Sequence, residues 1–511
     1  MKIQNLIFLI VVFILASGCK RNKLKTDEKS LAQTIRTEEE QLAYEQQLKE
    51  EHEKQLADSL AKLPKGFRFK EDRSVDPRIP PKIIDIAGNL HNFKSFKLSD
   101  FASEIEYVRI EQPDSSFHPQ MKFHYLMLDN YIVASNLYGI VLYSKQGELI
   151  SNVISNKITG VHYNPEKSVV TSSGTGTHIG SGSSLWHEGN KLYYTYVNSY
   201  TGQRYIMGLD CNNLPVTTPS GFNPEKSGSI IGLGKVELDL NHGRIPPMGS
   251  KKNTSTDLLD FRSMVNSMRT FALNKNTYFY PLRGKNMLAI FNSRGDTLAT
   301  FTKYEQVKNY TKTLTRGVDR GFHYQKNGKH YLRTDYNDTV FQILPPNRLL
   351  PVYVFNLGKH KIDKQQGIDP GVSLEGKIIP NGFAEFNNHI FIEFLKDNYD
   401  CSNNRKNKLV KQYYGVFNIF TYKFELVQAD SLDYSANILE NDIDGGFPVW
   451  PTTYNSDNGN EMLIPLFGWE LKQHIKSNNF INSNAPEGKK AVLKKLSEAV
   501  ADNDRILVVI K

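Results

Sequence analysis

The chain has 511 residues, of which 39% are hydrophobic and 23% charged, enough for a large core or for two domains. Aromatic residues make up 11%, with 28 Phe and 26 Tyr, and they favour strands. The formal net charge of +9 would usually point to nucleic acid, but the basic residues form no obvious stripe and the export signal described next argues against that partner. Acidic glycans, lipid headgroups or no specific partner fit the charge better.

Residues 1–18 predict a lipoprotein signal peptide. Lys2 precedes the apolar run Leu6–Ala16, and the small residues Ser17 and Gly18 lead to Cys19. This run is shorter than the about 20 residues that span a bilayer, and its flanks are typical of a secretory signal. We therefore expect cleavage before Cys19 and acylation, with palmitate among the chains, at that cysteine. Ala16 stands where a typical lipobox has a larger aliphatic residue, so ordinary secretion and an uncleaved anchor remain alternatives.

Residues 19–97 predict a collar, a tether and a linker. Lys20, Arg21, Lys23 and Lys25 form a basic collar, which either attracts anionic headgroups at about 1 kcal/mol each or is a solvated spacer. Residues 27–63 are rich in helix formers without Gly or Pro, but their leucines keep no heptad phase, which favours a solvated helical spacer over a coiled coil. The prolines that begin at Pro64 end helix formation and predict a linker.

Residues 98–511 predict an all-β domain built from repeated antiparallel units. One unit has strands at 277–280, 287–291 and 296–301, and an earlier one has strands at 131–135, 139–143 and 148–153. Both contain an aromatic residue, three further residues, a Gly and an acid, as in Tyr143 to Gly147-Glu148, and Gly supplies the positive φ of a tight hairpin turn. Four weaker copies begin near 191, 330, 389 and 461. Six such units favour a six-bladed β-propeller over a stacked sandwich.

Both ends of this domain predict strands of one shared blade. Glu104–Ile110 precedes the first unit, and Arg505–Ile510 lies at the other end, after a short amphipathic helix between Pro486 and Ala501. A blade that takes one strand from each end hides edges that otherwise invite aggregation.

Cys211 and Cys401 are the cysteines other than Cys19. They either form a disulfide in an oxidising compartment or remain two buried thiols. Without a CxxC motif they predict no metal site, and we expect no metal or other cofactor.

The chain resembles the Bacteroides-type six-bladed β-propeller lipoproteins, which are related in architecture to NHL-repeat propellers. The segments that carry the resemblance are 98–111, Tyr336–Phe341, Pro351–Tyr353, Leu357–Lys359, Asn441–Gly446, Trp450-Pro451 and the helix-plus-strand ending. The resemblance implies the fold for about residues 98–511 and carries no catalytic residue. Surface-displayed members often have acidic residues after the lipidated cysteine, so Lys20-Arg21 favours the periplasmic face of the outer membrane, with the cell surface as the alternative.

Two polar clusters are interpreted as turns. In Asn337-Asp338-Thr339, the Asn and Asp side chains can bond nearby backbone and start a strand. Asn441, Asp442 and Asp444 with two glycines resemble a calcium loop, but they lack its regular ligand spacing and closing Glu, which favours a turn.

The remaining candidates are weaker still. The glycine-rich loop 172–184 lacks the ending of a phosphate-binding loop, and the nearby His178 and His187 lack a third zinc ligand. No GxSxG or HExxH motif occurs. Aromatic residues that could stack on sugars, but are more often packed in blades, are Trp186, Tyr200, Trp450 and Trp469.

The expected function is therefore a non-enzymatic binding or scaffolding module in the bacterial envelope, held by a lipid anchor. Its loops, such as 155–185 and 211–265, would face an envelope protein or glycan partner. The binding residues themselves are not identified. A propeller-based hydrolase or lyase acting on glycan or peptide is the alternative, and a purely structural envelope protein is a third hypothesis.

Overall fold

The computed structural model divides the chain into two units, Met1–Lys65 and Gly66–Lys511, and each is described by itself. The leader, the basic collar and most of the tether lie outside the described residues. The structure describes residues 55–56, 58–60, 62–64, 66–111, 124–136, 139–155, 161–164, 169–172, 178–179, 186–188, 190–197, 204–213, 271–274, 277–281, 286–292, 296–304, 319, 321–326, 329–369, 372–397, 411–427, 438–451 and 461–511. Among the helices in these ranges, none is long and apolar enough to cross a membrane.

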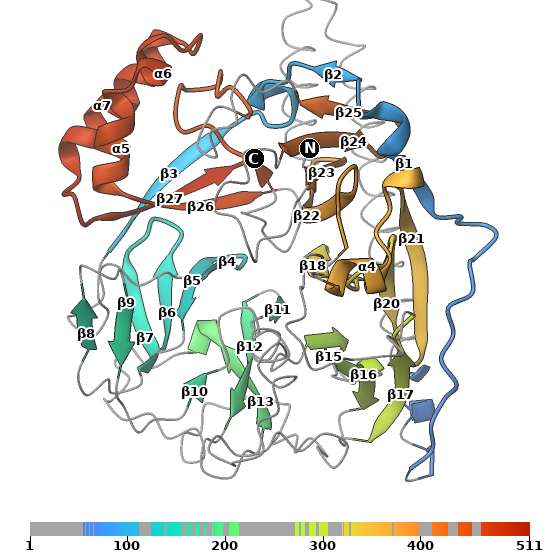
Figure 1. Ribbon diagram of the computed structural model, residues 1–511. Coiled ribbons are helices and arrows are strands. Elements are labelled where there is room, and N and C mark those ends of the chain that lie inside the picture. Colours follow the sequence, from blue (N-terminus) through green and yellow to red (C-terminus); the bar gives the residue numbers. More distant parts are fainter. Residues whose placement is uncertain are drawn as a thin grey trace, which may run out of the picture. The chain divides into compact units, whose positions relative to one another are not determined.

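Small sheets make up the second unit, and Figure 1 shows them as separate groups of arrows in the order of the chain. The first contains β4 (His124–Met127), β5 (Tyr131–Asn136), β6 (Gly139–Ser144) and β7 (Leu149–Ser155). The strands β8 (Val161–Asn164) and β9 (Val169–Ser172) form a two-stranded ribbon. The next sheet contains β10 (His178–Ile179), β11 (Trp186–Glu188), β12 (Lys191–Val197) and β13 (Arg204–Asp210), followed by the 3₁₀ turn η4 (Cys211–Asn213).

Three further sheets follow, and two of them gain a strand from the beginning of the unit. The first contains β14 (Phe271–Asn274), β15 (Thr277–Pro281), β16 (Asn286–Asn292) and β17 (Thr297–Thr302). The second contains β18 (Phe322–Lys326), β19 (Lys329–Arg333), β20 (Thr339–Leu344) and β21 (Arg348–Asn356), with β1 (Lys82–Asp85) parallel to β21. The third contains β22 (Ile378–Phe386), β23 (His389–Lys396), β24 (Lys411–Asn418) and β25 (Phe424–Val427), with β2 (Phe93–Lys94) parallel to β25.

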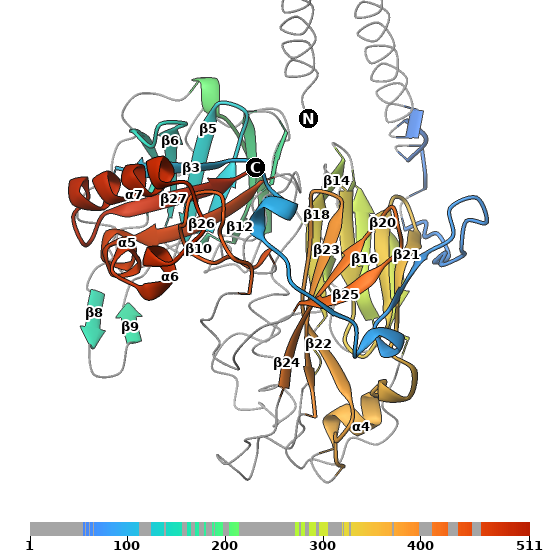
Figure 2. The ribbon, with the colours of Figure 1, turned by 90° about the horizontal axis from the view of Figure 1, so that it is seen from above.

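The last sheet joins both ends of the unit, as the sequence predicted. Its central strand β27 (Arg505–Ile510) pairs antiparallel with β26 (Met462–Phe467) on one side and with β3 (Ile105–Ile110) on the other. The amphipathic helix predicted before it is α7 (Glu487–Ala499), which lies with α5 (Gly468–Ile475) and α6 (Asn478–Ile481) beside this sheet (Figure 2). Buried Leu471, Phe480 and Leu493 anchor these helices in the core.

Neighbouring sheets touch one another through side chains. Contacts join the sheet of β4–β7 to those of β12 and β27, the sheet of β26 to that of β23, the sheet of β22 to that of β21, and the sheet of β18 to that of β14. Tyr131 donates to Asn212 in η4, after β13, and ring contacts join Phe383 to Tyr353 and Phe271 to His323. Val141 and Leu507 belong to one buried cluster, and Phe391 and Ile464 belong to another. This order is that of a propeller, so the predicted all-β, propeller-like arrangement is confirmed.

The number of blades differs from the prediction. Among the described residues, five sheets have four or five strands, one has three and one has two, so five blades of at least four strands are seen instead of six. The unit that begins near Glu461 forms only β26 before the chain turns into α5, α6 and α7, because apolar residues there repeat with a helical period.

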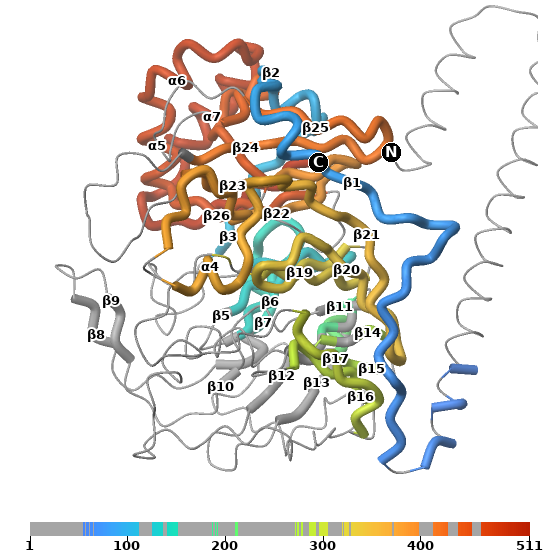
Figure 3. The backbone as a smooth tube through the Cα atoms, turned by 45° about the vertical axis from the view of Figure 1, so that its right-hand side comes forward, coloured from blue at the N-terminus to red at the C-terminus, as the bar shows by residue number. Residues whose placement is uncertain are grey.

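The expected linker also takes part in the fold. The tube of residues 66–97 runs along β21 and β25 and supplies the 3₁₀ turn η1 (Ala87–Asn89), ahead of η2 (Leu98–Asp100) (Figure 3). Its strands pair by backbone hydrogen bonds, which proline-rich composition does not reveal.

The turn glycine of the first repeat has the predicted conformation. Gly147 adopts a φ of +89°, and a Cβ there would lie 2.1 Å from the carbonyl oxygen of Arg109. The turn therefore needs glycine both for its backbone angle and for its approach to β3.

Candidate binding site

A buried ion pair supports the turn that follows β19. Asp319 accepts two hydrogen bonds from the guanidinium of Arg333, at 2.8 and 2.6 Å, and a third from the backbone N–H of Tyr336 at 2.9 Å. Both charged side chains are almost completely buried. A bidentate pair of this kind fixes orientation as well as distance, so it sets the path of residues 334–337.

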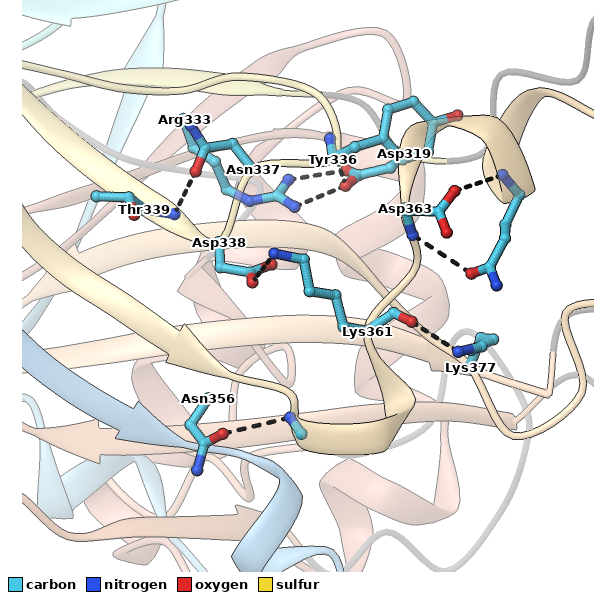
Figure 4. A network of polar contacts seen from close by, with 12 residues as sticks. Asp319, Arg333, Tyr336, Asn337, Asp338, Thr339, Asn356, Lys361, Asp363 and Lys377 are labelled. Atoms are coloured by element: carbon cyan, nitrogen blue, oxygen red, sulfur yellow. Dashed lines mark hydrogen bonds and ion pairs between the residues drawn. The ribbon is translucent and has the colours of Figure 1, made fainter. Parts of the chain in front are cut away.

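Asn337 forms the turn predicted from the sequence. Its Oδ1 accepts a hydrogen bond from the backbone N–H of Thr339 at 2.9 Å, at the first residue of β20 (Figure 4). Its Nδ2 atom is buried and has no hydrogen-bond partner among the described residues. The preceding Tyr336 has a φ of +60°, a conformation that few non-glycine residues adopt.

The segment after β21 packs against this turn. Lys361 follows the 3₁₀ turn η5 (Gly358–His360), and its ammonium lies 2.6 Å from the carboxylate of Asp338. The short helix α4 (Lys364–Ile368) is capped by Asp363, whose carboxylate accepts from the N–H of Gln366 at 2.8 Å. Lys377 Nζ donates to the carbonyls of Lys359 and Lys361 at 3.2 and 2.8 Å (Figure 4). Residues 359–366 are thus held by an ion pair, a helix cap and hydrogen bonds from Lys377.

A pocket of about 140 Å³ lies between the end of β17, the turn after β19 and the start of α4. Its lining is polar, with two tyrosine rings and no aliphatic side chain. The lining residues are Lys303, Tyr304, Thr334, Asp335, Tyr336, Asn337, Lys361 and Lys364.

Positive charge predominates in this pocket. Three lysines and one aspartate give the lining a formal charge of +2. Lys361 is paired with Asp338, and Lys364 Nζ lies 3.6 Å from Asp335. No ion pair joins Lys303 to another residue in the described ranges. The arrangement can therefore attract and bind an anion without first breaking an ion pair at Lys303.

Most of the chain matches a known protein family. The family model "Domain of unknown function (DUF4933)" matches residues 64–477, which is most of the chain. The chain belongs to the DUF4933 family. No curated protein matches it.

Solved structures similar to this DUF4933 chain share little sequence with it. A "Putative exported protein" (BF0058) from Bacteroides fragilis is 13% identical, with a TM-score of 0.45, over 84% of this chain and 99% of that one. The extracellular domain of a hybrid two-component system (BT4673) from B. thetaiotaomicron is 9% identical, with a TM-score of 0.24, over 64% and 39% of the two chains.

The second polar cluster of the DUF4933 chain is also a turn. Asn441 Oδ1 accepts from the N–H of Asp444 at 3.2 Å, and Asp444 accepts from the N–H of Gly446 at 2.8 Å and from the hydroxyl of Tyr107 at 2.8 Å. Asp442 accepts from the N–H and hydroxyl of Ser99. These carboxylates hold the turn against β3 and η2, which confirms the structural interpretation.

Other candidates divide between packed and exposed positions. Trp450 is buried edge-on against Phe391 and Tyr414, so it packs in a blade, whereas Trp469 is 48% exposed at the start of α5. Cys211 is buried, and burial together with nearby Asp210 raises the pKa of its thiol to about 12. Cys401, Tyr200, most of the glycine-rich loop and the side chains of His178 and Trp186 lie outside the described residues, and His187 falls on β11 without an adjacent cluster of metal ligands in the described ranges.

The pocket lysines were not anticipated from the sequence. Lys303, Lys361 and Lys364 come from two segments about 60 residues apart, and each is surrounded by ordinary surface composition. Only the prediction of a turn at Asn337 pointed to this part of the chain.

Proposed function

We propose that the chain is a membrane-anchored lipoprotein whose six-bladed propeller acts as a binding or scaffolding module in the bacterial envelope. We count the three-stranded sheet of β26, β27 and β3 as the sixth blade, because it lies between the sheets of β23 and β6. Acylation at Cys19 would hold the chain at the outer membrane, facing the periplasm or, alternatively, the cell surface.

The observation that carries the binding role is the lysine-lined pocket. Surface lysines usually extend into water, whereas here three of them line one polar cavity that ion pairs and a helix cap hold in shape. A preformed cavity with convergent polar groups is typical of a binding site.

The three buried carboxylates among the described residues favour this role over catalysis. Asp319 and Asp444 hold turns, and buried Glu385 accepts from Lys326 at 2.5 Å and from the hydroxyls of Tyr324 and Tyr353. Each of these acids is engaged by donors from the fold, whereas a general acid or base needs access to a substrate. A hydrolase or lyase therefore has no specific support among these residues.

The test is a binding screen with the full, lipidated chain in detergent micelles. The chain is applied to an array of bacterial envelope glycans and crosslinked in intact envelopes, beside the Lys303→Gln/Lys361→Gln variant. We expect a reproducible ligand with the wild type and loss of that ligand with the variant. Absence of any reproducible ligand, or release of cleaved glycan or peptide, contradicts the proposal.

A further inference from the structure

The three pocket lysines differ in whether an ion pair restrains them. Carboxylates restrain Lys361 and Lys364, at 2.6 and 3.6 Å, so these ammonium groups have fixed positions in the wall. Lys303 follows β17 directly, lies in a half-buried position and has no ion pair with the described residues. Two positioned charges and one uncompensated charge make a site that is ready for one negatively charged group.

The size of the pocket limits the ligand to a small group. Its volume of about 140 Å³ is well below the roughly 300–1,000 Å³ of pockets that enclose a drug-sized molecule. It therefore fits one charged unit of a larger molecule.

The remaining lining residues indicate which groups of the ligand surround its negative charge. Besides the charged residues, the lining includes the polar residues Thr334, Tyr304 and Asn337 and no aliphatic residue. Such walls suit a ligand whose anion is surrounded by hydroxyl groups. An acyl chain or an apolar peptide side chain would desolvate these polar groups without replacing their hydrogen bonds.

We propose that this pocket binds the carboxylate or phosphate group of an acidic sugar unit in an envelope glycan. The inference rests on the proposed binding function and narrows its ligand class. Ammonium groups bind either oxyanion as point charges, so the pocket chemistry is shared between uronic acids and sugar phosphates.

The experiment is ligand-observed NMR with the full chain in detergent micelles and three monosaccharide probes. Glucuronate and glucose 1-phosphate test the two anions, and glucose is the neutral control. We expect at least one anionic probe to bind, glucose not to bind at the same concentration, and affinity to fall with added salt. Equal binding of glucose overturns the proposal.

Matched variants locate the binding. Lys303→Gln removes the uncompensated charge and is expected to weaken the anionic probe by about tenfold, the effect of one charge-assisted hydrogen bond. Lys359→Gln removes an exposed lysine outside the lining and should leave affinity unchanged. Equal loss in both variants would show general charge attraction and overturn the site.

Two results separate this inference from the function on which it rests. Capture of an envelope ligand by the wild type, without binding of either anionic probe, overturns the acidic-sugar assignment and leaves the binding module in place. Failure of both the envelope screen and the probes overturns both.

Discussion

Tyr336 and Gly367 meet beside the pocket, and their contact leaves no room for a side chain. A Cβ at Gly367 would lie 2.0 Å from Cε1 of the Tyr336 ring, which is buried with Ile362 and Ile368. Because Tyr336 also lines the pocket, a side chain at position 367 would displace its ring and change the shape of the cavity.

We therefore expect Gly367→Ala to destabilise the protein. Displacing a buried ring typically costs about 1–3 kcal/mol, which thermal unfolding followed by circular dichroism would show as a lower Tm. Gly488→Ala is the control, because its Cβ meets nothing within 4 Å in helix α7. Equal Tm values for the two variants would contradict the contact.

The Asp319–Arg333 pair is expected to be the more sensitive of two ion pairs. Arg333→Met would leave the Asp319 carboxylate buried without its charged partner, at a cost of about 3–5 kcal/mol in the free energy of unfolding. Arg78→Met breaks a pair in which the arginine side chain is 87% exposed, and should leave the free energy of unfolding almost unchanged, because water screens the two charges. Urea denaturation of both variants measures the difference, and similar losses would refute the assigned role.

At the scale of elements, β27 is the strand on which the shared sheet depends. All six of its residues are buried, and it pairs with strands on both sides. Leu507 is completely buried in a cluster with residues of the five strands β3, β4, β5, β6 and β26.

Leu507→Ala should therefore reduce stability by about 2–5 kcal/mol, through lost burial and a cavity. Lys511→Ala is the control, because it removes only a partly exposed ion pair with Glu106 just beyond the strand. Limited proteolysis and urea denaturation would report the effect, and a neutral Leu507→Ala would show that the sheet is held elsewhere.

The sequence predicted strands where apolar and aromatic side chains form short runs bounded by turn residues. β15, β16, β5 and β6 are short runs rich in apolar and aromatic residues, and the pairing of β3 with β27 followed from two strands without other partners. β1 and β2 escaped prediction because their parallel pairing depends on backbone groups, and β1 also directly follows Pro80-Pro81. The pocket escaped because its lysines share no periodicity and are assembled only by the approach of α4 to the turn after β19.

At the scale of the whole molecule, two partly buried histidines link stability to pH. Burial lowers the pKa of His474, whose Nε2 donates to the Gly445 carbonyl at 2.9 Å, and burial likewise lowers the pKa of His389. The unfolded chain then binds more protons near its ordinary histidine pKa of about 6.5, so stability is present above that pH and falls as pH decreases through it.

The midpoint of urea unfolding should accordingly decrease between pH 7.5 and pH 5. His474→Gln removes one of the two groups, so the decrease should be smaller in that variant. Identical pH dependence in the two proteins would remove His474 as a contributor.

The proposed anchor makes a prediction for the whole chain in its cell. Cys19→Ser should prevent incorporation of a palmitate analogue and release the protein from the membrane fraction, because the remaining hydrophobic leader is removed or too short to span a bilayer. Cys211→Ser, at a buried position in the second unit, should retain both label and membrane association. Unchanged fractionation of Cys19→Ser would contradict lipidation.

The pairing of β3 with β27 also has a consequence for biosynthesis. The two strands lie about 400 residues apart, so at roughly 5–20 residues per second β3 is made about 20–80 s before its partner. During that interval the ribosome-bound chain cannot complete this sheet, and β3 remains an unpaired edge that could pair with another chain. A nascent chain kept unfinished in this way is in the state that passage through a narrow secretion channel requires.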